Sequence, residues 1–357
     1  MGRWNVHGEY SSGDFMRLLI RDIRGDEEGV ASTVGTIMAL LVFLTFLSLI
    51  VNQYVPVWMK DSEASHMNGA LGQFGGIKGA IDLQILSAQA AQIAGTHYIP
   101  VTASSAVSLG VDGVPIFAAS TLGTLQSFPD AGGFWVNFSY IPNPTVPLQV
   151  ATVNETSSGA IQLDVGNRYY IPQTIAYENG AVIRSQSDGQ VIRAQPTFSV
   201  LKTNNTLDIS FGLVSLYGAG SVSGTSTEVV NTQVFAFDRQ DYRGFPANAV
   251  IWVDHPSRYG LAWYRFLNAT LASSLNLCPS TSFSPCLFSQ NSLDISLTAK
   301  IGATIIYILS AKYNPTTQTY IMHLEIHNSP VLPLSYFRLQ HAQVQVGVGD
   351  ATSNVQF

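Results

Sequence analysis

Residues 29 to 51 read Gly-Val-Ala-Ser-Thr-Val-Gly-Thr-Ile-Met-Ala-Leu-Leu-Val-Phe-Leu-Thr-Phe-Leu-Ser-Leu-Ile-Val and contain no charged side chain. As an α-helix, the segment from Val30 to Val51 would be about 33 Å long, enough to cross a hydrocarbon core of about 30 Å. A helix also satisfies its own backbone N–H and C=O groups, as the interior of a bilayer requires. The stretch therefore predicts a membrane-spanning helix over residues 30–55, preceded by a leader at residues 1–29.

The charges on either side of this span indicate its orientation. Arg17, Arg21 and Arg24 precede it, whereas only Lys60 and Lys78 follow within a comparable distance. Cytoplasmic flanks of membrane helices carry an excess of Lys and Arg, so the leader is predicted in the cytoplasm and the rest of the chain outside. We expect a single-pass protein of the cell membrane with an extracellular C-terminal domain, or a subunit of a surface filament.

The start of the span carries a second pattern, because the polar leader ends in Gly29 and the apolar helix begins at Val30. A secretory signal has a shorter apolar region, followed by an Ala-x-Ala-like site that residues 52–66 lack. The arrangement resembles the class III signal of archaeal type IV pilin-like proteins, although Glu28 stands where that family usually has a basic residue. The resemblance implies cleavage by a prepilin peptidase between Gly29 and Val30. An uncleaved signal anchor is the alternative.

A second helix is predicted over residues 56–96. Pro56 removes one helix hydrogen bond and is expected to kink or end the first helix. Asp61 and Ser62 are good N-cap residues, and no proline follows before Ala94. Apolar residues recur there at helical spacing, at Met67, Leu71, Phe74, Ile81 and Ile85.

Glycines recur in the same helix at steps of three and four, at Gly69, Gly72, Gly76 and Gly79. Each glycine costs about 1 kcal/mol in a helix interior, so four on one face call for a close-packing reason. We expect this face to lie against the β domain or a neighbouring subunit. A hinge or a flexible glycine-rich linker is the alternative.

From His97 onward the pattern changes to short apolar runs separated by Gly, Pro and Asn, which is typical of β structure. Asn179-Gly180 predicts a two-residue hairpin turn, and a second turn at Asp188-Gly189 extends it to a three-stranded meander over 173–194. Asp112-Gly113 predicts another hairpin. Further strands are predicted over residues 134–141, 160–170, 197–202, 206–217, 227–237, 249–254, 293–309, 318–327 and 336–348.

These elements predict an α+β protein, with a long N-terminal helix followed by a predominantly antiparallel, sandwich-like β ectodomain in two lobes at 97–237 and 238–357. In pilin-like subunits, the second half of a long N-terminal helix packs on the head, and this layout is similar. Tyr177-Glu-Asn-Gly180 resembles a hairpin of archaeal pilin-like ectodomains, and Leu216–Gly224 resembles a segment that follows it. The resemblance covers roughly residues 29–237 and implies pilin-like subunits or a homo-oligomer as partners, besides the membrane and the peptidase.

Composition argues against nucleic acid as a partner. Beyond residue 96 the chain has 11 Lys or Arg and 14 Asp or Glu, with no basic run to follow a phosphate backbone. An extracellular domain could carry N-glycans at its four Asn-x-Ser/Thr sequons, which begin at Asn137, Asn154, Asn204 and Asn268.

The chain has two cysteines, Cys278 and Cys286. A disulfide between them would staple an exposed loop and stabilise it by about 2 to 3 kcal/mol, and the expected exterior location permits one. Two unpaired thiols are the alternative. No metal-type spacing such as Cys-x-x-Cys competes with this interpretation.

Three motifs contain residue types that could carry chemistry, and none predicts a catalytic, cofactor or metal site. Gly220-Ser-Val-Ser-Gly224 has a valine where a hydrolase elbow needs its nucleophile. His323, Glu325 and His327 would share one strand face and could hold a metal, but a solvated strand face is favoured. Triad residues are far apart in sequence, so Asp254-His-Pro-Ser257 is interpreted as a turn that closes the strand Val250 to Val253, which Pro256 ends.

The expected function is therefore structural: a membrane-anchored subunit of an archaeal type IV pilus-like surface assembly that acts in assembly or adhesion. A monomeric anchored ectodomain that binds a glycan or protein partner is the alternative. An extracellular hydrolase is disfavoured because the sequence offers no convergent catalytic set, and no cofactor is expected.

Overall fold

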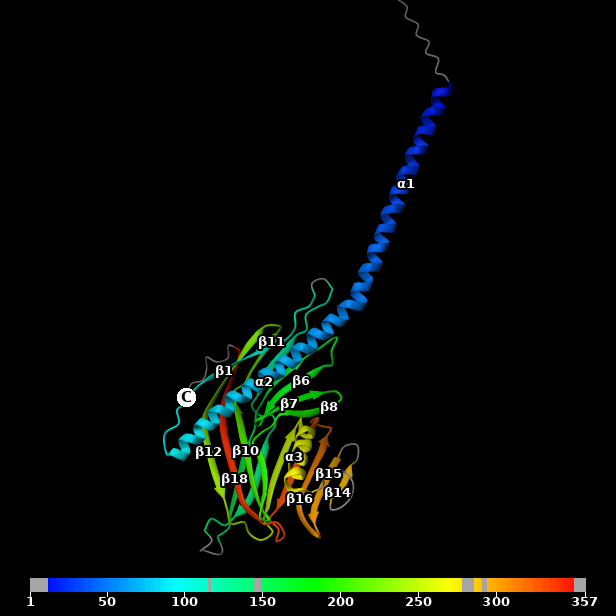
Figure 1. The fold of residues 1–357 in the computed structure, drawn as a ribbon. Helices are drawn as coiled ribbons and strands as arrows, with labels where there is room; N and C mark the ends of the chain where they lie inside the picture. The colour runs from blue at the N-terminus through cyan, green and yellow to red at the C-terminus, as the bar shows by residue number, and fades with distance from the viewer. Residues whose placement is uncertain (1–11, 115–116, 144–148, 278–285, 291–293, 350–357) are drawn as a thin grey trace, which may run out of the picture. The chain divides into compact units, whose positions relative to one another are not determined.

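The predicted membrane-spanning segment is part of a continuous run of helix. In the computed structural model, α1 (Ser12–Leu49) leads through a π-helical turn (Ile50–Tyr54) into α2 (Val55–Ala94) (Figure 1). The structure describes residues 12–114, 117–143, 149–277, 286–290 and 294–349, with the backbone alone for 12–30, 286–288 and 290.

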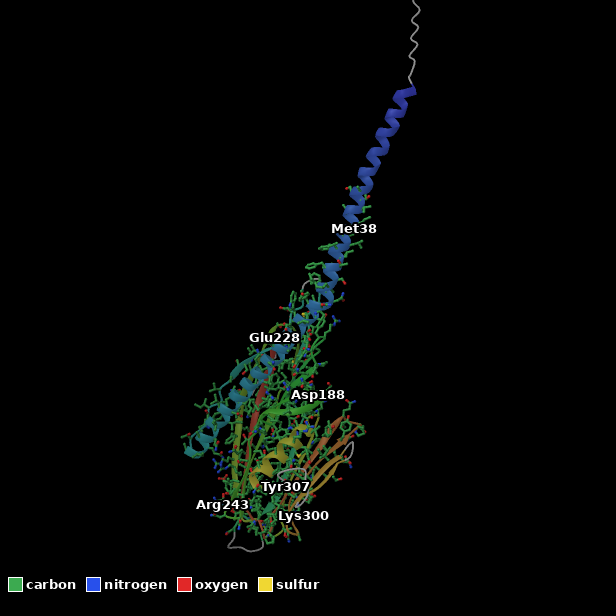
Figure 2. All side chains as sticks on the ribbon, turned by 45° about the vertical axis from the view of Figure 1, so that its right-hand side comes forward. Met38, Asp188, Glu228, Arg243, Lys300 and Tyr307 are labelled. Atoms are coloured by element: carbon green, nitrogen blue, oxygen red, sulfur yellow. The ribbon has the colours of Figure 1, made fainter. Side chains whose placement is uncertain are left out.

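One helix of the described residues is long and apolar enough to cross a membrane, and none of its most apolar window is buried. Side chains around Met38, drawn in Figure 2, are largely exposed along α1. The helix of the expected length and composition is thus present. Gly29 and Val30, the expected cleavage site, lie within the helical backbone of α1.

Pro56 neither ends nor interrupts the helical run. Val55 donates its backbone N–H to the C=O of Ile50, which is a π-type bond, and Pro56 then has no N–H to place. A π turn widens the helix locally, which relieves the clash that a proline ring makes with the preceding turn. Of the two expected outcomes, a kink or an end, the helix end is wrong: a π turn lies just before Pro56 in a continuous helix.

The described strands form three sheets. The first, in which only β10 and β18 pair in parallel, has the order β1 (Ala103–Ser108), β12 (Thr227–Tyr242), β18 (Leu334–Val348), β10 (Thr206–Tyr217), β9 (Phe198–Thr203). The second has the order β11 (Gly220–Gly224), β2 (Gly123–Phe128), β5 (Ala160–Val165), β6 (Gln173–Glu178), β7 (Ala181–Gln186), β8 (Gly189–Ala194). The third has the order β14 (Cys286–Gln290), β15 (Asp294–Ile301), β16 (Thr304–Asn314), β17 (Thr319–His327), β13 (Val250–Ser257), β3 (Phe134–Tyr140), β4 (Ala151–Ser157). The α+β fold class, with mostly antiparallel sheets, is confirmed.

Two hydrophobic cores lie in the β domain, and the long strands of the first sheet contribute to both. On β10, Phe211 belongs to the core that contains the third sheet and α3 (Gly260–Leu275), whereas Leu216 belongs to the core under α2. On β18, Phe337 and Val344 divide in the same way. Residues 59–357 form one compact unit, and β12 runs across the predicted boundary at 237/238. The division into two lobes is therefore corrected.

Helix α2 lies across the first and second sheets, as Figure 1 shows, and its apolar stripe faces them. The predicted residues Met67, Phe74 and Ile81 are buried in this core, and Leu71 and Ile85 pack at its edge. The helical interpretation of this segment is confirmed, and a flexible linker is excluded.

The hairpin at Asn179-Gly180 joins β6 to β7 as predicted, and both turn residues have positive φ, as a type I′ turn requires. The next turn lies one residue earlier than predicted, because Gln186 pairs with Gly189. The prediction of a hairpin at Asp112-Gly113 is wrong, since β1 pairs with the distant β12.

Candidate functional site

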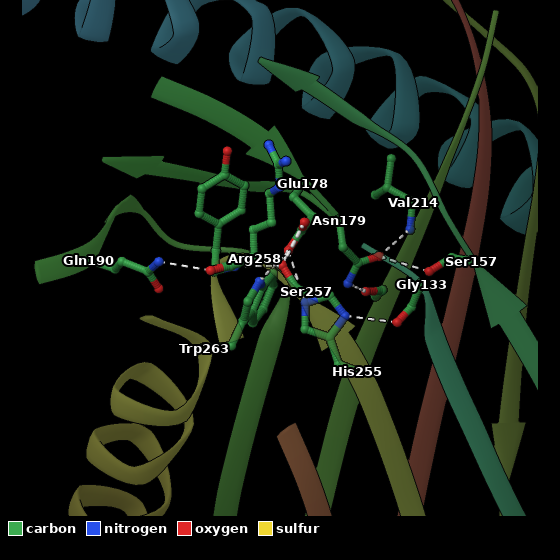
Figure 3. A network of polar contacts seen from close by, with 12 residues as sticks. Gly133, Ser157, Glu178, Asn179, Gln190, Val214, His255, Ser257, Arg258 and Trp263 are labelled. Carbon is green, nitrogen blue, oxygen red and sulfur yellow. Dashed lines mark hydrogen bonds and ion pairs between the residues drawn. The ribbon is translucent and has the colours of Figure 1, made fainter. Parts of the chain in front are cut away.

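The hairpin β6–β7 carries a buried carboxylate at its tip. Glu178, the last residue of β6, accepts hydrogen bonds from Nε2 of His255 at 2.9 Å, Nε1 of Trp263 at 2.8 Å and Oγ of Ser257 at 2.8 Å (Figure 3). The alternation of β13 points both His255 and Ser257 inward, and α3 brings Trp263 from the other side. One side chain thus joins the second sheet, the third sheet and α3.

The imidazole of His255 lies between two acceptors. Its Nδ1 is 2.8 Å from the carbonyl oxygen of Gly133, and its Nε2 faces the Glu178 carboxylate. A carbonyl oxygen only accepts, so Nδ1 carries a proton and donates to Gly133, and both ring nitrogens are occupied. Phe134 stacks on this ring with centroids 3.7 Å apart and covers its face.

The turn residue beside this carboxylate is also buried, and both its amide oxygen and its amide nitrogen are hydrogen-bonded. Asn179 accepts the backbone N–H of Val214 at 2.7 Å and the hydroxyl of Ser157, and it donates to the carbonyl of Gly212. Hairpin tips usually lie in solvent, so a buried tip indicates that this turn locks the sheets together.

A cleft of about 630 Å³ opens beside this network. Residues of all three sheets line it, among them Gln162, Glu178 and Ser257 in its wall and Trp135 and Tyr217 near its rim. Gly132 is required there, because its φ is +61° and a Cβ atom would lie 2.2 Å from Oε2 of Glu178.

The hydrogen bonds do not form a nucleophilic triad. Ser257 donates to Glu178 and not to His255, whose ring nitrogens are both occupied, so the imidazole is not placed to deprotonate the hydroxyl. Burial, together with the charge of Glu178, raises the pKa of Tyr259, which keeps that phenol a neutral donor to Gln162. The arrangement holds structure and shapes the cleft.

The interpretation of residues 254–257 as a closing turn was wrong. Strand β13 continues to Ser257, and Pro256 pairs with Ile321 of β17. A proline is tolerated because β3, on the other side, pairs only as far as Asp254 and requires no N–H from residue 256. His255 and Ser257 therefore converge on Glu178 because they are two residues apart on one strand.

A second buried carboxylate lies on α2. Glu63 accepts the hydroxyl of Thr121 at 2.6 Å and the backbone N–H groups of Arg168, Tyr169 and Tyr170 at 3.0, 2.8 and 2.6 Å. It is fully buried and fastens the first part of α2 to the loop between β5 and β6. The sequence indicates that Glu63 is buried, because Glu63 lies four residues before Met67 and so falls on the apolar stripe of the helix.

On the outer face of the third sheet, acids and imidazoles alternate in a row, as the period of two predicts for His323, Glu325 and His327. His323 contacts Asp254 at 2.5 Å and Glu325 at 2.9 Å, and Glu325 contacts His327 at 3.0 Å. Among the residues that the structure describes, no group of three or more such side chains is placed to hold a metal ion.

Because of this row, the stability of the β domain is expected to fall at alkaline pH. The hydrogen bond that His323 donates to Asp254, supported by Glu325 and opposed by burial, raises the pKa of His323 to about 9. A folded pKa above the unfolded value of about 6.5 gives stabilisation that is complete below pH 6.5 and lost as the pH rises through about 9. Urea unfolding of the detergent-solubilised protein at pH 7 and pH 9.5 should show a loss up to about 2 kcal/mol larger than in His323→Gln. Equal losses would contradict the assignment.

The glycine face of α2 does not meet the β domain. A Cβ atom built at Gly69, Gly72, Gly76 or Gly79 has nothing within 4 Å, and the same holds for Gly75. The expectation of close packing against the β domain is therefore corrected: the buried stripe of α2 lies on the opposite side of the helix from these glycines.

Because the space around these glycines is empty, replacing them with alanine is predicted to increase stability. Gly72→Ala with Gly76→Ala should stabilise the folded β domain by up to about 1 kcal/mol per site, since alanine is the better helix former and nothing in the protomer opposes its methyl group. Thermal melting of the solubilised protein measures this, and a lower melting temperature would mean that the methyl groups meet something.

The predicted modification sites differ in accessibility. Asn137 and Asn154 are exposed and face each other across β3 and β4, and Asn204 is exposed in the β9–β10 turn. Asn268 lies within α3, where its side-chain oxygen is buried without a hydrogen-bond partner in the described part of the chain. Cys278 and the side chain of Cys286 lie outside the described residues, so the disulfide stays a prediction.

Comparisons with protein-family models, with curated proteins and with solved structures gave no significant match to this chain. The pilin-like resemblance therefore rests on the motifs of the sequence alone.

Proposed function

We propose that this chain is a membrane-anchored structural subunit of a surface assembly of the archaeal type IV pilus-like kind. Its apolar helix would lie in the membrane or in a filament core, and the β domain would be displayed outside for assembly or adhesion. The uncharged, exposed stretch of α1 supports the anchor. The packing of α2 on the β domain supports a subunit in which one helix serves both the anchor and the head.

The observation that carries the proposal is the bare glycine face of α2. Each glycine lowers the stability of the helix by about 1 kcal/mol, and no contact inside the protomer offsets that loss. Small residues at three- and four-residue spacing let a second helix approach closely. A neighbouring subunit whose helix lies on Gly69, Gly72 and Gly76 would supply the missing reason.

Exposed apolar side chains extend this face toward the end of α2. Leu83, Leu86 and Ile93 are 67%, 59% and 71% exposed. Leu83 also borders a hollow of about 400 Å³ together with Ile99 and Val101. An exposed apolar surface of this kind is characteristic of a protein contact, because contact with another protein removes it from water.

Larger side chains on the glycine face of α2 test the proposal. Gly72→Leu with Gly76→Leu should leave the melting temperature of the solubilised protein at or above wild type, because the space is empty in the protomer. The same variant, expressed in the native host, should lose its place in high-molecular-weight surface material after chemical cross-linking, because leucine overfills a close helix contact. Lys202→Leu, at an exposed site on β9, is the control and should assemble normally. Normal assembly of the glycine variant would contradict the proposal.

A further inference from the structure

The cleft beside Glu178 has two aromatic side chains at its rim. Trp135 on β3 and Tyr217 at the end of β10 line it, and they are 45% and 42% exposed. Large aromatic rings are usually buried, where they stabilise the fold. Two partly exposed rings beside one cleft therefore offer flat apolar surfaces to a ligand.

The Trp135 ring is held in place by the buried network. A Cβ atom on Gly133 would lie 3.1 Å from Cη2 of Trp135, so the ring rests on the bare backbone of Gly133. His255 fixes that backbone by donating to the carbonyl of Gly133 at 2.8 Å, and Gly132 packs against the Glu178 carboxylate. The buried His255–Glu178 pair thus supports a preorganised Trp135 ring, which lowers the ordering cost of binding.

The remaining lining is rich in hydroxyl and amide groups and is nearly neutral. Its two exposed charges, Asp130 and Arg258, have opposite signs, and the Glu178 carboxylate is already hydrogen-bonded inside the wall. The polar groups that are at least partly exposed include Thr156, Asn314 and Thr317, whereas Gln162 and Ser215 lie behind them, buried and hydrogen-bonded to Tyr259 and His341. Such a lining exchanges hydrogen bonds with a polyhydroxylated ligand and gives no preference to a charged one.

We propose that this cleft binds a neutral saccharide. The apolar faces of the sugar rings would stack on Trp135 and Tyr217, and the sugar hydroxyls would hydrogen-bond to the hydroxyl and amide side chains. The volume of about 630 Å³ lies within the range of small-ligand sites. Saccharide binding gives the displayed β domain an adhesive role, yet it does not depend on assembly.

The test uses full-length protein in mild detergent on a printed array of neutral oligosaccharides and of oligosaccharides that carry carboxylate groups. The neutral saccharide that gives the strongest signal is then titrated in solution while tryptophan fluorescence is followed. Wild type should bind neutral saccharides, and Trp135→Ala should weaken that binding about tenfold or more, the effect of losing one well-placed stacking contact. Tyr217→Phe, which keeps the ring, should bind better than Tyr217→Ala.

The matched control is Trp252→Ala. Trp252 lies on the adjacent strand β13 and is 42% exposed, but it does not line the cleft, so its loss should leave binding within twofold of wild type. Binding of the acidic saccharides alone, no saccharide binding, or an equal loss in Trp135→Ala and Trp252→Ala would each overturn the proposal. The result is independent of the glycine-face variants, which report on assembly.

Discussion

Glu178→Ala is expected to leave too little folded protein to purify, or to lower the unfolding free energy by about 4 kcal/mol or more. The change removes the acceptor of His255, Ser257 and Trp263 at once and leaves three donors without a partner inside the protein. Each unmet buried donor costs about 1 to 3 kcal/mol, and the lost side chain adds a cavity. The unfolding free energy of a domain is only about 5 to 15 kcal/mol, so this loss is a large part of the total.

Two variants make that result interpretable. Glu178→Gln keeps the shape and an acceptor oxygen for Trp263, so it should be clearly more stable than the alanine variant. Glu155→Ala removes a partly exposed acid from β4 that faces His341 at 3.4 Å, and it should cost less than about 1 kcal/mol. If Glu178→Ala melted within a few degrees of wild type, the network would not hold the sheets together.

Glu63→Ala is expected to lower the unfolding free energy by about 3 to 5 kcal/mol. Four donors lose their acceptor at a fully buried position, and three of them are backbone N–H groups that no other described side chain serves. Unmet buried donors cost about 1 to 3 kcal/mol each, less than additively. Glu63→Gln should rescue little, because its amide nitrogen would turn a donor toward donors.

Amide hydrogen exchange locates this effect. In wild type the N–H groups of Arg168, Tyr169 and Tyr170 should be strongly protected, and in Glu63→Ala they should exchange faster before the rest of the second sheet does. Asp61→Ala, at an exposed site on the same helix, is the control and should change neither exchange nor stability. Unaltered protection at residues 168–170 in the Glu63 variant would contradict the anchor.

Local patterns predicted much of this fold. The apolar run that begins at Val30 and the helical spacing from Met67 to Ile81 predicted helix, because packing and hydropathy there follow the helical period. Asn179-Gly180 predicted its hairpin, since few residues adopt the positive φ values of that turn. Strands β3, β6, β7, β10 and β17 lie within one residue of the predicted bounds.

Helix α3 was missed although Trp263, Leu267, Leu271 and Leu275 recur at steps of four. Its surroundings read as β structure, and that context outweighed a helical period that the burial of these residues now explains. Gly302 splits the single strand predicted over 293–309 into β15 and β16. A one-residue turn signal inside a long apolar run is too weak to be read alone.

The candidate site was beyond local patterns because its parts meet only in the folded chain. Glu178 and His255 are 77 residues apart, and Glu63 and Tyr169 are 106 apart. Glu178 stands within an apolar stretch, whereas Glu63 has polar neighbours in sequence and falls on the apolar stripe only by helical spacing; a charge at either position needs a buried partner. Sequence spacing does not name that partner, because strand order across the three sheets is set by long-range packing.

The mature N-terminus tests the pilin-like account most directly. Protein purified from the surface fraction of its native host should begin Val30-Ala31-Ser32 when its N-terminal peptide is identified by mass spectrometry, because cleavage between Gly29 and Val30 frees the apolar helix for assembly. Only that account requires removal of the leader. Peptides from residues 1–29 joined to Val30 in the mature surface fraction would show an uncleaved anchor and contradict it.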